Sequence, residues 1–405
     1  MKNVLYLSYD GMTDPLGQSQ VLPYLAGLSQ KGIYFTLVSF EKPERFEPER
    51  AKIQAFCDEH DIDWKPQLYT KRPPVLSTLL DIRKMSRAAF SLHQKKQFQL
   101  VHCRSYISAL IGVKLKRKKG IRLLFDMRGF WADERIEGRI WDIRNPLFKS
   151  IYNYFKKQER HFFEESDAIV SLTEAGKNEI LSWKLPSVST EKITVIPCCA
   201  DLNLFDPEKN DPDTIFTKKS EYQLNDKYIV GYVGSIGTWY QLPEMLLTFR
   251  HIKQLKPSAV FLFVTKEAPS SILQEAKKLE LDPGSIRIVP VSHHHVPLFI
   301  AMFDCSIFFI RPTFSKKASS PTKQGEIMAM GIPLICNAGV GDTDEIVNRY
   351  HAGLILKDTK DETLTSFNLD FPHFNRESSM LGAKEYFGLE RGVESYFYIY
   401  DHFVG

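Results

Sequence analysis

Short apolar segments alternate with longer amphipathic segments along the first half of the chain. An unbroken apolar run of about four to eight residues is typical of a buried strand, and apolar positions three or four apart are typical of a helix. The pattern predicts strands at residues 3–9, 34–40, 100–103, 122–126, 168–172 and 193–196, and helices near 18–31, 74–96, 105–118, 147–165 and 174–183.

The same alternation begins again in the second half. It predicts strands at residues 228–233, 259–264, 286–289, 305–310 and 334–336, and helices near 240–255, 269–280, 296–303, 321–330 and 343–349. Strands that alternate with helices form parallel sheets, so we expect an α/β protein with two Rossmann-like domains. Residues 206–213 are polar, contain Pro and lack periodicity, which indicates a linker. We therefore expect domains over residues 1–205 and 206–405.

Aromatic residues recur at helical spacing near the end of the chain. Spacings of three and four residues place five side chains on one predicted face: Val393, Tyr396, Phe397, Tyr400 and Phe403. This indicates a last helix over about residues 390–404 with an apolar face that packs on a core. The pattern does not distinguish packing on the second domain from a return to the first.

The composition is that of an ordinary globular protein. Of its 405 residues, 43% are hydrophobic and 25% charged, which excludes disordered, collagen-like and disulfide-stapled chains. The net charge of +4 conceals an asymmetry. Residues 1–200 carry 32 Lys and Arg against 23 Asp and Glu, and residues 95–160 alone carry 17 against 6. Such a basic half indicates an anionic surface or substrate.

We expect a cytoplasmic protein. The first ten residues hold one Lys and a short apolar run that meets Asp10, which is unlike a secretory signal. No apolar run approaches the roughly 18 residues of a membrane-spanning helix. The six cysteines form no CxxC pair and are expected to be reduced and buried.

Two loops that follow predicted strands carry candidate chemistry, because ligands of open parallel sheets bind beyond the strands' carboxyl ends. Residues 10–19 include Gly17 and suit the close approach of an anion, although they lack a dinucleotide-binding GxGxxG pattern and a plain turn explains them equally well. Residues 125–135 include Asp126 and Arg128. The Asp126 carboxylate could contact a sugar hydroxyl or act as a general base, and the alternative is a salt bridge with Arg128.

Residues 314–335 carry the strongest signal. Ser320 can cap a helix whose first residue is Pro321. Hydroxyls, lysines and free N–H groups then gather at a helix N-terminus, which is an arrangement that binds a diphosphate. Glu326, about one turn inside the helix, could accept hydrogen bonds from ribose hydroxyls. The alternative is a capped surface helix with solvated lysines.

We expect no metal, no cofactor and no nucleic acid partner. His293, His294 and His295 are consecutive, so their side chains diverge, and we interpret them as a polar loop. Asp61 and Asp63 lie in a polar stretch ahead of any clear strand and are interpreted as solvated. The chain contains no HExxH or EF-hand pattern, no GxSxG or P-loop, and no recognised nucleic-acid-binding module.

Several motifs resemble retaining glycosyltransferases of family 4, which have the GT-B fold. The resembling segments are V-I-P-C-C-A-D-L-N-L-F at 195–205, V-G-Y-V-G-S at 230–235, S-P-T-K at 320–323 with the following Glu326, G-V-G-D at 339–342, and F-D-M-R-G-F-W-A-D-E at 125–134. The resemblance implies an N-terminal acceptor-binding domain and a C-terminal donor-binding domain. It further implies sugar transfer with retention in a cleft between them, without a required metal.

The resemblance also implies roles for individual residues. It places Glu326 on the donor ribose and Lys323 at the diphosphate. Together with the strand-end residues Asp126 and Arg128, these are the residues that we expect to be catalytic. The donor would be bound by Gly17, Gly234, Ser235, Lys316, Lys317, Ser319, Ser320, Thr322, Lys323 and Glu326. Gly17 would let the first-domain loop approach the donor.

The chain departs from the family pattern at three places. Ala318 stands where many members have a glutamate, Gly234 lacks the Arg and Lys that usually follow it, and Asp126 replaces a histidine of the catalytic loop. The missing Arg and Lys normally neutralise the departing diphosphate. The groups that could replace them are Lys316, Lys317, Lys323, Arg104 and Arg128.

The resemblance favours a UDP- or GDP-sugar donor and a glycan or lipid-linked acceptor in bacterial-type cell-surface polysaccharide synthesis. Residues 95–160 are basic and rich in aromatic residues, and we expect them to meet an anionic membrane at the inner face of the plasma membrane. Two alternatives remain: a GT-B sugar-nucleotide epimerase, and an inactive subunit that binds a sugar nucleotide or a membrane surface.

Overall fold

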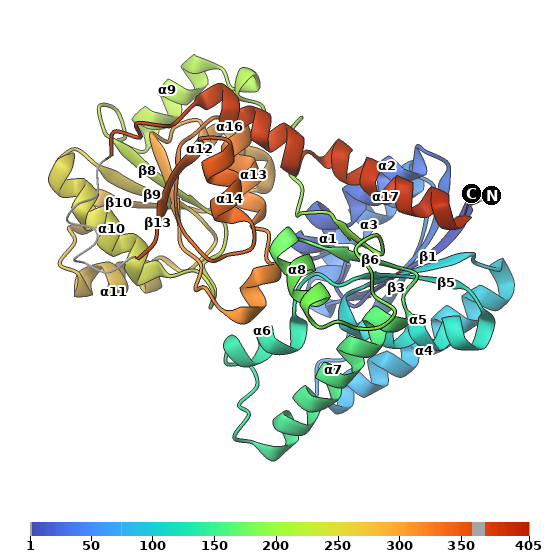
Figure 1. Ribbon diagram of the computed structural model, residues 1–405. Helices are drawn as coiled ribbons and strands as arrows, with labels where there is room; N and C mark the ends of the chain where they lie inside the picture. Colours follow the sequence, from blue (N-terminus) through green and yellow to red (C-terminus); the bar gives the residue numbers. More distant parts are fainter. Residues whose placement is uncertain (1, 74, 359–368, 405) are drawn as a thin grey trace. The chain divides into compact units, whose positions relative to one another are not determined.

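The chain divides into two units, each with its own sheet. The computed structural model describes residues 2–73, 75–358 and 369–404 (Figure 1). The first unit combines Met1–Cys198 with Leu389–Gly405, and the second is Cys199–Gly388. Each unit is built on one parallel sheet, which confirms the predicted α/β fold class. The division between the units falls before the expected boundary at residues 205 and 206.

The first unit contains a seven-stranded sheet in the order β3-β2-β1-β4-β5-β6-β7, with all neighbours parallel. Its strands are β1 (Lys2–Ser8), β2 (Ile33–Glu41), β3 (Ile62–Leu68), β4 (Leu100–Arg104), β5 (Arg122–Asp126), β6 (Ala168–Ser171) and β7 (Ile193–Val195). The helices that precede β7 are α1 (Pro15–Gln20), α2 (Leu22–Ser29), α3 (Pro43–Glu59), α4 (Leu76–Lys96), α5 (Ser105–Lys119), α6 (Trp131–Glu137), α7 (Pro146–Glu165) and α8 (Glu174–Ser182).

The apolar pattern did not predict α3, β3 or α6. In the edge strand β3, buried Ile62 and Trp64 alternate with polar residues, so the strand lacks a continuous apolar run. The interpretation of Asp61 and Asp63 as lying ahead of any strand is therefore wrong for Asp63, whereas Asp61 precedes β3 and is exposed. Asp63 lies in β3 and forms ion pairs of 2.6 Å with both Lys65 and Lys96.

The second unit contains a six-stranded sheet in the order β10-β9-β8-β11-β12-β13. Its strands are β8 (Ile229–Val233), β9 (Val260–Val264), β10 (Ile286–Val289), β11 (Cys305–Phe308), β12 (Leu334–Asn337) and β13 (Gly353–Leu356). Its helices are α9 (Pro212–Glu221), α10 (Leu242–Leu255), α11 (Pro269–Lys278), α12 (Val296–Ile300), α13 (Thr322–Ala329), α14 (Thr343–Arg349) and α16 (Arg376–Gly382). The sequence pattern missed α9, α16 and β13, and α9 begins inside the stretch interpreted as a linker.

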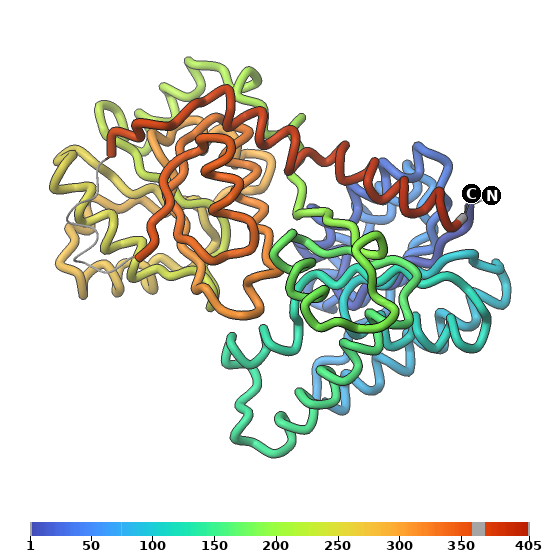
Figure 2. Tube along the Cα trace, in the orientation of Figure 1, coloured from blue at the N-terminus to red at the C-terminus, as the bar shows by residue number. Residues whose placement is uncertain are grey.

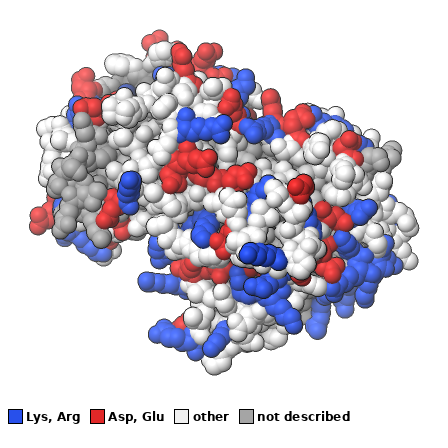
Figure 3. Space-filling model, viewed as in Figure 1, with Lys and Arg blue, Asp and Glu red and all other residues white. Residues whose placement is uncertain are grey.

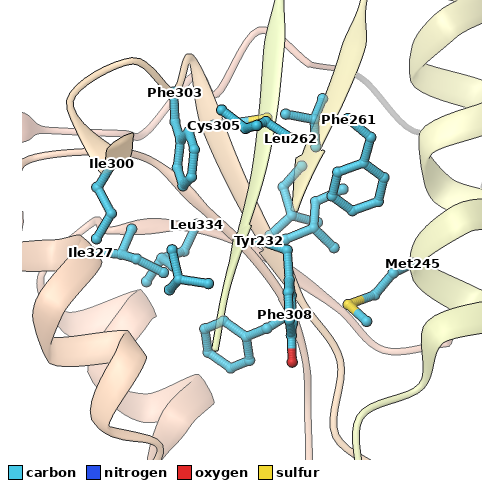
Figure 4. Packing of buried hydrophobic residues seen from close by; sticks show 14 of the residues in the cluster. Tyr232, Met245, Phe261, Leu262, Ile300, Phe303, Cys305, Phe308, Ile327 and Leu334 are labelled. Carbon is cyan, nitrogen blue, oxygen red and sulfur yellow. The ribbon is translucent and has the colours of Figure 1, made fainter. Parts of the chain in front are cut away.

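The core of the second unit lies on both faces of this sheet. Tyr232 on β8 and Phe261 on β9 are completely buried, as is Met245 on α10. Figure 4 shows Met245 and Ile327 of α13 approaching the strands from opposite sides. The helix α13 is therefore fixed to the sheet by its apolar face, and its position depends on the core.

The helix α17 (Leu389–Val404) belongs to the first unit, where it packs on α2 (Figure 2). Val393 lies so close to Gly27 that a Cβ on Gly27 would be 2.8 Å from Val393 Cγ2. The ring of Tyr396 meets that of Tyr24 edge-on at 5.6 Å. The aromatic face predicted for this helix thus packs into the core of the first unit. Among the described residues, no helix is both long and apolar enough to cross a membrane.

Candidate functional site

The loop after β1 is shaped by the carboxylate of Glu41. This side chain, at the end of β2, is fully buried and accepts hydrogen bonds from the N–H groups of Met12 (2.9 Å) and Thr13 (3.0 Å) and from the Thr13 hydroxyl (2.7 Å). These donors offset the cost of burying the carboxylate. The loop therefore has a fixed shape, although nothing in the sequence distinguishes Glu41 from the other acidic residues.

Gly17 lies in α1, directly against this loop. A Cβ on Gly17 would be 2.3 Å from the Gly11 carbonyl oxygen and 2.7 Å from Met12 Cα. No side chain fits at such distances, so α1 can pack on the loop only with a glycine here. The contact of Gly17 with a donor stays a prediction.

Asp126 stands at the end of β5 beside Arg104 at the end of β4, because the two are register partners. Its carboxylate is 1% exposed. Oδ1 lies 3.8 Å from Arg128 Nη1, and Oδ2 lies 3.8 Å from Arg104 Nη1 and 3.5 Å from His102 Nε2. Burial opposes ionisation, but Arg128, His102 and Arg104 outweigh it, so the pKa of Asp126 lies below its usual value. Asp126 is therefore a buried carboxylate at neutral pH.

Arg128 has an unusual backbone conformation. Its φ is +56°, in the left-handed region that disfavours residues with a Cβ. The guanidinium is held inside the unit, where it donates a hydrogen bond to Cys198 Sγ at 3.2 Å. Burial lowers the pKa of Arg128, but Asp126 more than compensates, and the pKa lies well above its usual value. The salt bridge with Arg128, which the sequence offered as the alternative to a functional role of Asp126, is present, and the functional role stays a prediction.

Two tyrosines of α17 reach this charged cluster. The Tyr396 hydroxyl donates to Asp126 Oδ2 at 3.1 Å, and the Tyr400 hydroxyl lies 2.5 Å from His102 Nδ1. Burial lowers the pKa of His102, so its ring is neutral at pH 7. The sequence did not predict the hydrogen bond between Tyr396 and Asp126, because these two residues are 270 positions apart.

In the second unit, the helix α13 follows β11 and a 3-10 turn at Phe314–Ala318. The prediction that Ser320 caps this helix is wrong. Pro321 occupies the N-cap position, and no side chain caps the helix. A helix that starts at Thr322 places Lys323 in its first turn, where the side chain turns toward the end of β8.

Lys323 is buried, with 7% of its surface exposed, and Nζ has no hydrogen-bond partner among the described residues. The ammonium lies 3.9 Å from the ring centre of Tyr232 and 3.7 Å from that of Tyr240. Burial lowers its pKa well below the usual value, although Glu326 acts in the opposite direction. The alternative of a surface helix with solvated lysines is therefore wrong for Lys323, and also for Lys316, which is 6% exposed.

The turn after β8 lies over the Lys323 ammonium. Gly234 has φ +93°, and a Cβ on it would be 3.5 Å from Lys323 Nζ. The following Ser235 is exposed. Further along the same loop, the ring of Trp239 lies 3.7 Å from Lys316 Nζ. The structure thus brings Gly234, Lys316 and Lys323 to one end of the sheet, and their binding of a donor stays a prediction.

Glu326, about one turn after Lys323, is also largely buried. Its Oε1 lies 3.3 Å from His293 Nε2. This hydrogen bond is the main cause that raises the pKa of His293 above its usual value. The three histidines are exposed, as expected of a polar segment. The sequence did not predict that His293 contacts Glu326, the residue expected to bind the donor ribose.

The remaining predicted donor residues lie around the start of α13. Ser319, Ser320 and Thr322 are half-buried. Lys317 is exposed, and its ammonium lies 5.3 Å from the ring centre of Phe314. Within residues 2–73, 75–358 and 369–404, no group of three or more His, Cys, Asp or Glu side chains is arranged to hold a metal ion.

Two family models together match most of the chain. The model described as Glycosyltransferase Family 4 matches residues 18–204, and the model described as Glycosyl transferases group 1 matches residues 214–366. The chain belongs to the GT-B glycosyltransferases of the family 4 type. No curated protein matches the chain.

Solved structures with the same fold cover nearly the whole chain. Sucrose-phosphate synthase (tll1590) from Thermosynechococcus elongatus has a TM-score of 0.74 and 14% identity, covering 99% of both chains. Anabaena Alr3699/HepE, in complex with UDP, has a TM-score of 0.70 and 12% identity, covering 99% of this chain and 100% of that chain. A glycosyltransferase from Rickettsia africae ESF-5 has a TM-score of 0.66 and 16% identity, covering 99% and 98%.

Proposed function

We propose that the protein transfers a sugar, with retention and without a metal, from a UDP- or GDP-sugar to a hydroxyl of a glycan or lipid-linked acceptor. One observation carries the proposal. The buried ammonium of Lys323 has no acceptor among the described residues and sits at the N-terminal turn of a helix, at the end of a parallel sheet. A buried ammonium without a hydrogen-bond acceptor is costly in the free protein, and an anionic ligand would compensate that cost.

A nucleoside diphosphate matches this arrangement. As the bond between the sugar and the phosphate breaks, negative charge grows on the leaving diphosphate. Lys323, together with the N–H groups of the first turn of α13, would stabilise that charge more in the transition state than in the ground state. Lys316, which is also buried at this end of the sheet, is the second candidate for neutralising the diphosphate. These groups would replace the family's Arg and Lys.

Glu326 would hold the ribose of the same donor. Its carboxylate is largely buried and lies next to His293, so it has a fixed position about one turn from Lys323. Ribose hydroxyls are hydrogen-bond donors that a carboxylate accepts well. Uridine is favoured as the nucleoside because Anabaena Alr3699/HepE, which has this fold, is in complex with UDP.

In the first unit, Asp126 would contact the acceptor. The carboxylate is ionised and stands at the end of a strand, where ligands of parallel sheets bind. It could orient an acceptor hydroxyl, while a phosphate oxygen of the donor takes the proton, so that the incoming oxygen and the leaving group share one face of the sugar. Arg128 would hold the carboxylate in its charged form.

A panel of sugar nucleotides tests the donor assignment. We would measure thermal stabilisation by UDP-, GDP-, ADP- and CMP-sugars, and the release of nucleoside diphosphate with and without a glycan acceptor. Stabilisation by a UDP- or GDP-sugar and acceptor-dependent release support the transferase. Stabilisation by none of the four would contradict the donor site.

The same panel separates the two alternatives. An epimerase would convert the sugar nucleotide in the absence of any acceptor. An inactive subunit would be stabilised by a sugar nucleotide without turning it over with any acceptor. The buried Ala318 at the position of the family's glutamate is the observation that favours the inactive subunit, because a carboxylate that other members use is missing.

A second proposal concerns the membrane partner and refines the basic segment 95–160. On the α6–α7 connection and α7, four apolar side chains are about half exposed: Ile140, Ile143, Leu147 and Tyr154. Basic side chains lie among them, at Arg139, Arg144, Lys149 and Lys157, and these are exposed as well. Figure 3 shows Lys and Arg gathered at the lower right of the first unit, where Figure 1 draws α4, α5 and α7. Apolar and basic groups on one surface match an anionic lipid interface, where a lipid-linked acceptor would be found.

Vesicle binding tests this surface. Replacing both Ile143 and Leu147 by Ser should lower co-sedimentation with anionic vesicles about tenfold, because two side chains lose their burial in lipid. Leu255→Ser, at an equally exposed leucine of the second unit, is the matched control and should leave binding unchanged. Binding that does not depend on the anionic lipid content would contradict the proposal.

A further inference from the structure

The carboxylate of Asp126 is held by a hydroxyl from the far end of the sequence. Tyr396 of α17 donates to Asp126 Oδ2 at 3.1 Å. Both side chains are buried, with exposures of 4% and 1%. A hydrogen bond to a carboxylate in a buried site is stronger than one between neutral groups at the surface. The contact is therefore expected to restrict how the carboxylate can rotate.

The two oxygens of Asp126 have different surroundings. Oδ2 receives the Tyr396 hydroxyl and also faces His102 Nε2 at 3.5 Å and Arg104 Nη1 at 3.8 Å. Oδ1 faces Arg128 Nη1 at 3.8 Å, is buried, and has no hydrogen-bond partner among the described residues. One oxygen is thus held by a hydrogen bond, and the other is enclosed beside Arg128 without a donor.

The packing of α17 fixes the Tyr396 hydroxyl in place. The Tyr396 ring lies edge-on to Tyr24, at 5.6 Å between ring centres, and 5.5 Å from the His102 ring. One turn earlier, Val393 fills the space beside Gly27. A rotation of the Tyr396 ring away from Asp126 would disrupt these contacts, so the hydroxyl cannot easily move away.

We propose that Tyr396 is a positioning residue that binds Oδ2 of Asp126 and so keeps Oδ1 turned toward Arg128, in the orientation in which the carboxylate would meet the acceptor hydroxyl. The inference rests on the proposed transfer, in which Asp126 orients that hydroxyl. Tyr396 itself touches neither the acceptor nor the donor in this scheme. Burial, with Asp126 as a further cause, raises the pKa of Tyr396 well above its usual value, so the phenol keeps its proton and remains a donor.

Several charged and titratable groups around Asp126 and Tyr396 contribute to the electrostatic surroundings of the Asp126 carboxyl in addition to the Tyr396 hydroxyl. They are Tyr6 on β1, Asp10 after β1, Tyr24 on α2, His102 and Arg104 on β4, Arg128 after β5, Cys198 after β7, and Tyr400 on α17. Arg104 and Arg128 favour the carboxylate, so the loss of Tyr396 is expected to shift the titration of Asp126 without abolishing its charge.

Tyr396→Phe removes only the hydroxyl and keeps the ring. We expect kcat to fall about tenfold, which corresponds to the loss of one hydrogen bond to a charged group, with little change in the donor KM. The acid limb of the pH profile should move to higher pH, because the carboxylate loses a donor that favours its ionised form. Tyr398→Phe on the same helix is the matched control. Tyr398 is 79% exposed, so the control should behave like the unchanged protein.

A double-mutant cycle in thermal unfolding tests the contact without any assay of activity. Tyr396→Phe should lower the unfolding temperature clearly, and by much less when Asp126 is already replaced by Asn, because the hydroxyl acts on the charge. Equal losses in the two backgrounds, or an unchanged kcat in Tyr396→Phe, would overturn the proposal. If the protein turns over no sugar nucleotide, unequal losses still support the fixing of Asp126 by Tyr396, and the failure lies with the proposed transfer alone.

Discussion

Lys323 places an ammonium group between the rings of Tyr232 and Tyr240 without a hydrogen-bond acceptor among the described residues. The two rings provide a modest attraction, since a cation near an aromatic face gains roughly 0.5–2 kcal/mol. Burial acts in the opposite direction and lowers the pKa of the ammonium well below its usual value. This side chain is therefore expected to reduce the stability of the free protein and to contribute only when an anion is bound.

Replacing Lys323 by Met separates these two effects. Turnover should fall about 100-fold or more with a much smaller change in the donor KM, because charge stabilisation is greatest in the transition state. The unfolding temperature of the donor-free variant should rise, since a buried charge is replaced by an apolar chain of similar length. Steady-state kinetics and a thermal melt measure the two outcomes.

Lys277→Met is the control for this substitution. Lys277 lies on α11 and is exposed, so its replacement should change neither the unfolding temperature nor kcat by much. Turnover close to that of the unchanged protein in Lys323→Met would remove Lys323 from the mechanism. A lower unfolding temperature in that variant would show that the buried ammonium stabilises the free protein.

The sequence predicted the central strands of both sheets better than the edge strand β3 and the more polar helices. Continuous apolar runs predicted the central strands well, because a strand buried on both faces needs apolar residues at every position. The apolar pattern did not predict the edge strand β3, because only one of its faces is buried. It did not predict α3, because charged residues cover most of that helix. The helix α13 was predicted, but its start was misplaced by the capping rule, which favoured Ser320 over Pro321.

Some residues of the candidate site could likewise be predicted from the sequence, and others could not. Asp126, at the end of a predicted strand, and Lys323, in a helix that follows one, could be identified from the sequence because topology places strand ends together. Tyr396, His293 and Glu41 could not. Each acts through a contact between distant parts of the chain, and such contacts depend on packing that no local pattern encodes.

At the scale of one element, α1 depends on the missing side chain of Gly17. Gly17→Ala should lower the free energy of unfolding by about 1–3 kcal/mol, because its Cβ would overlap the backbone of the loop held by Glu41. Denaturant unfolding measures this loss. Leu16→Ala, at the neighbouring and largely exposed position, should change stability by less than about 0.5 kcal/mol. A fully stable Gly17→Ala protein would mean that the loop after β1 can move aside.

The whole molecule contains a unit made from two separate stretches of sequence. The first unit consists of residues before Cys199 and residues after Gly388, and α17 contributes Val393, Tyr396 and Tyr400 to its buried core. The distribution of charge follows the two halves of the chain, with the basic excess before residue 200. The helix α17 also contacts Asp126 and His102 of this unit through the hydroxyls of Tyr396 and Tyr400. Its removal would therefore expose buried polar groups as well as apolar surface, which the removal of a surface helix would not.

A chain that stops at Gly388 should therefore have a weakened first unit. Each of the three buried side chains contributes about 1.5–3 kcal/mol of burial, so the first unit should lose more than about 3 kcal/mol of unfolding free energy. The second unit contains all of its own strands and should keep its stability. Limited proteolysis with mass analysis should show early cleavage within residues 1–198. Equal resistance of the shortened and complete chains would contradict the assigned role of α17.

The return of α17 to the first unit also sets an order for folding during synthesis. Every residue of the second unit leaves the ribosome before α17 does, so that unit can complete its core while the surface of α2 that receives Val393 and Tyr396 is still uncovered. During this interval, the apolar surface around Tyr24 and Gly27 is available to chaperones and to other nascent chains. The part of the protein that is translated first is therefore the part that becomes native last.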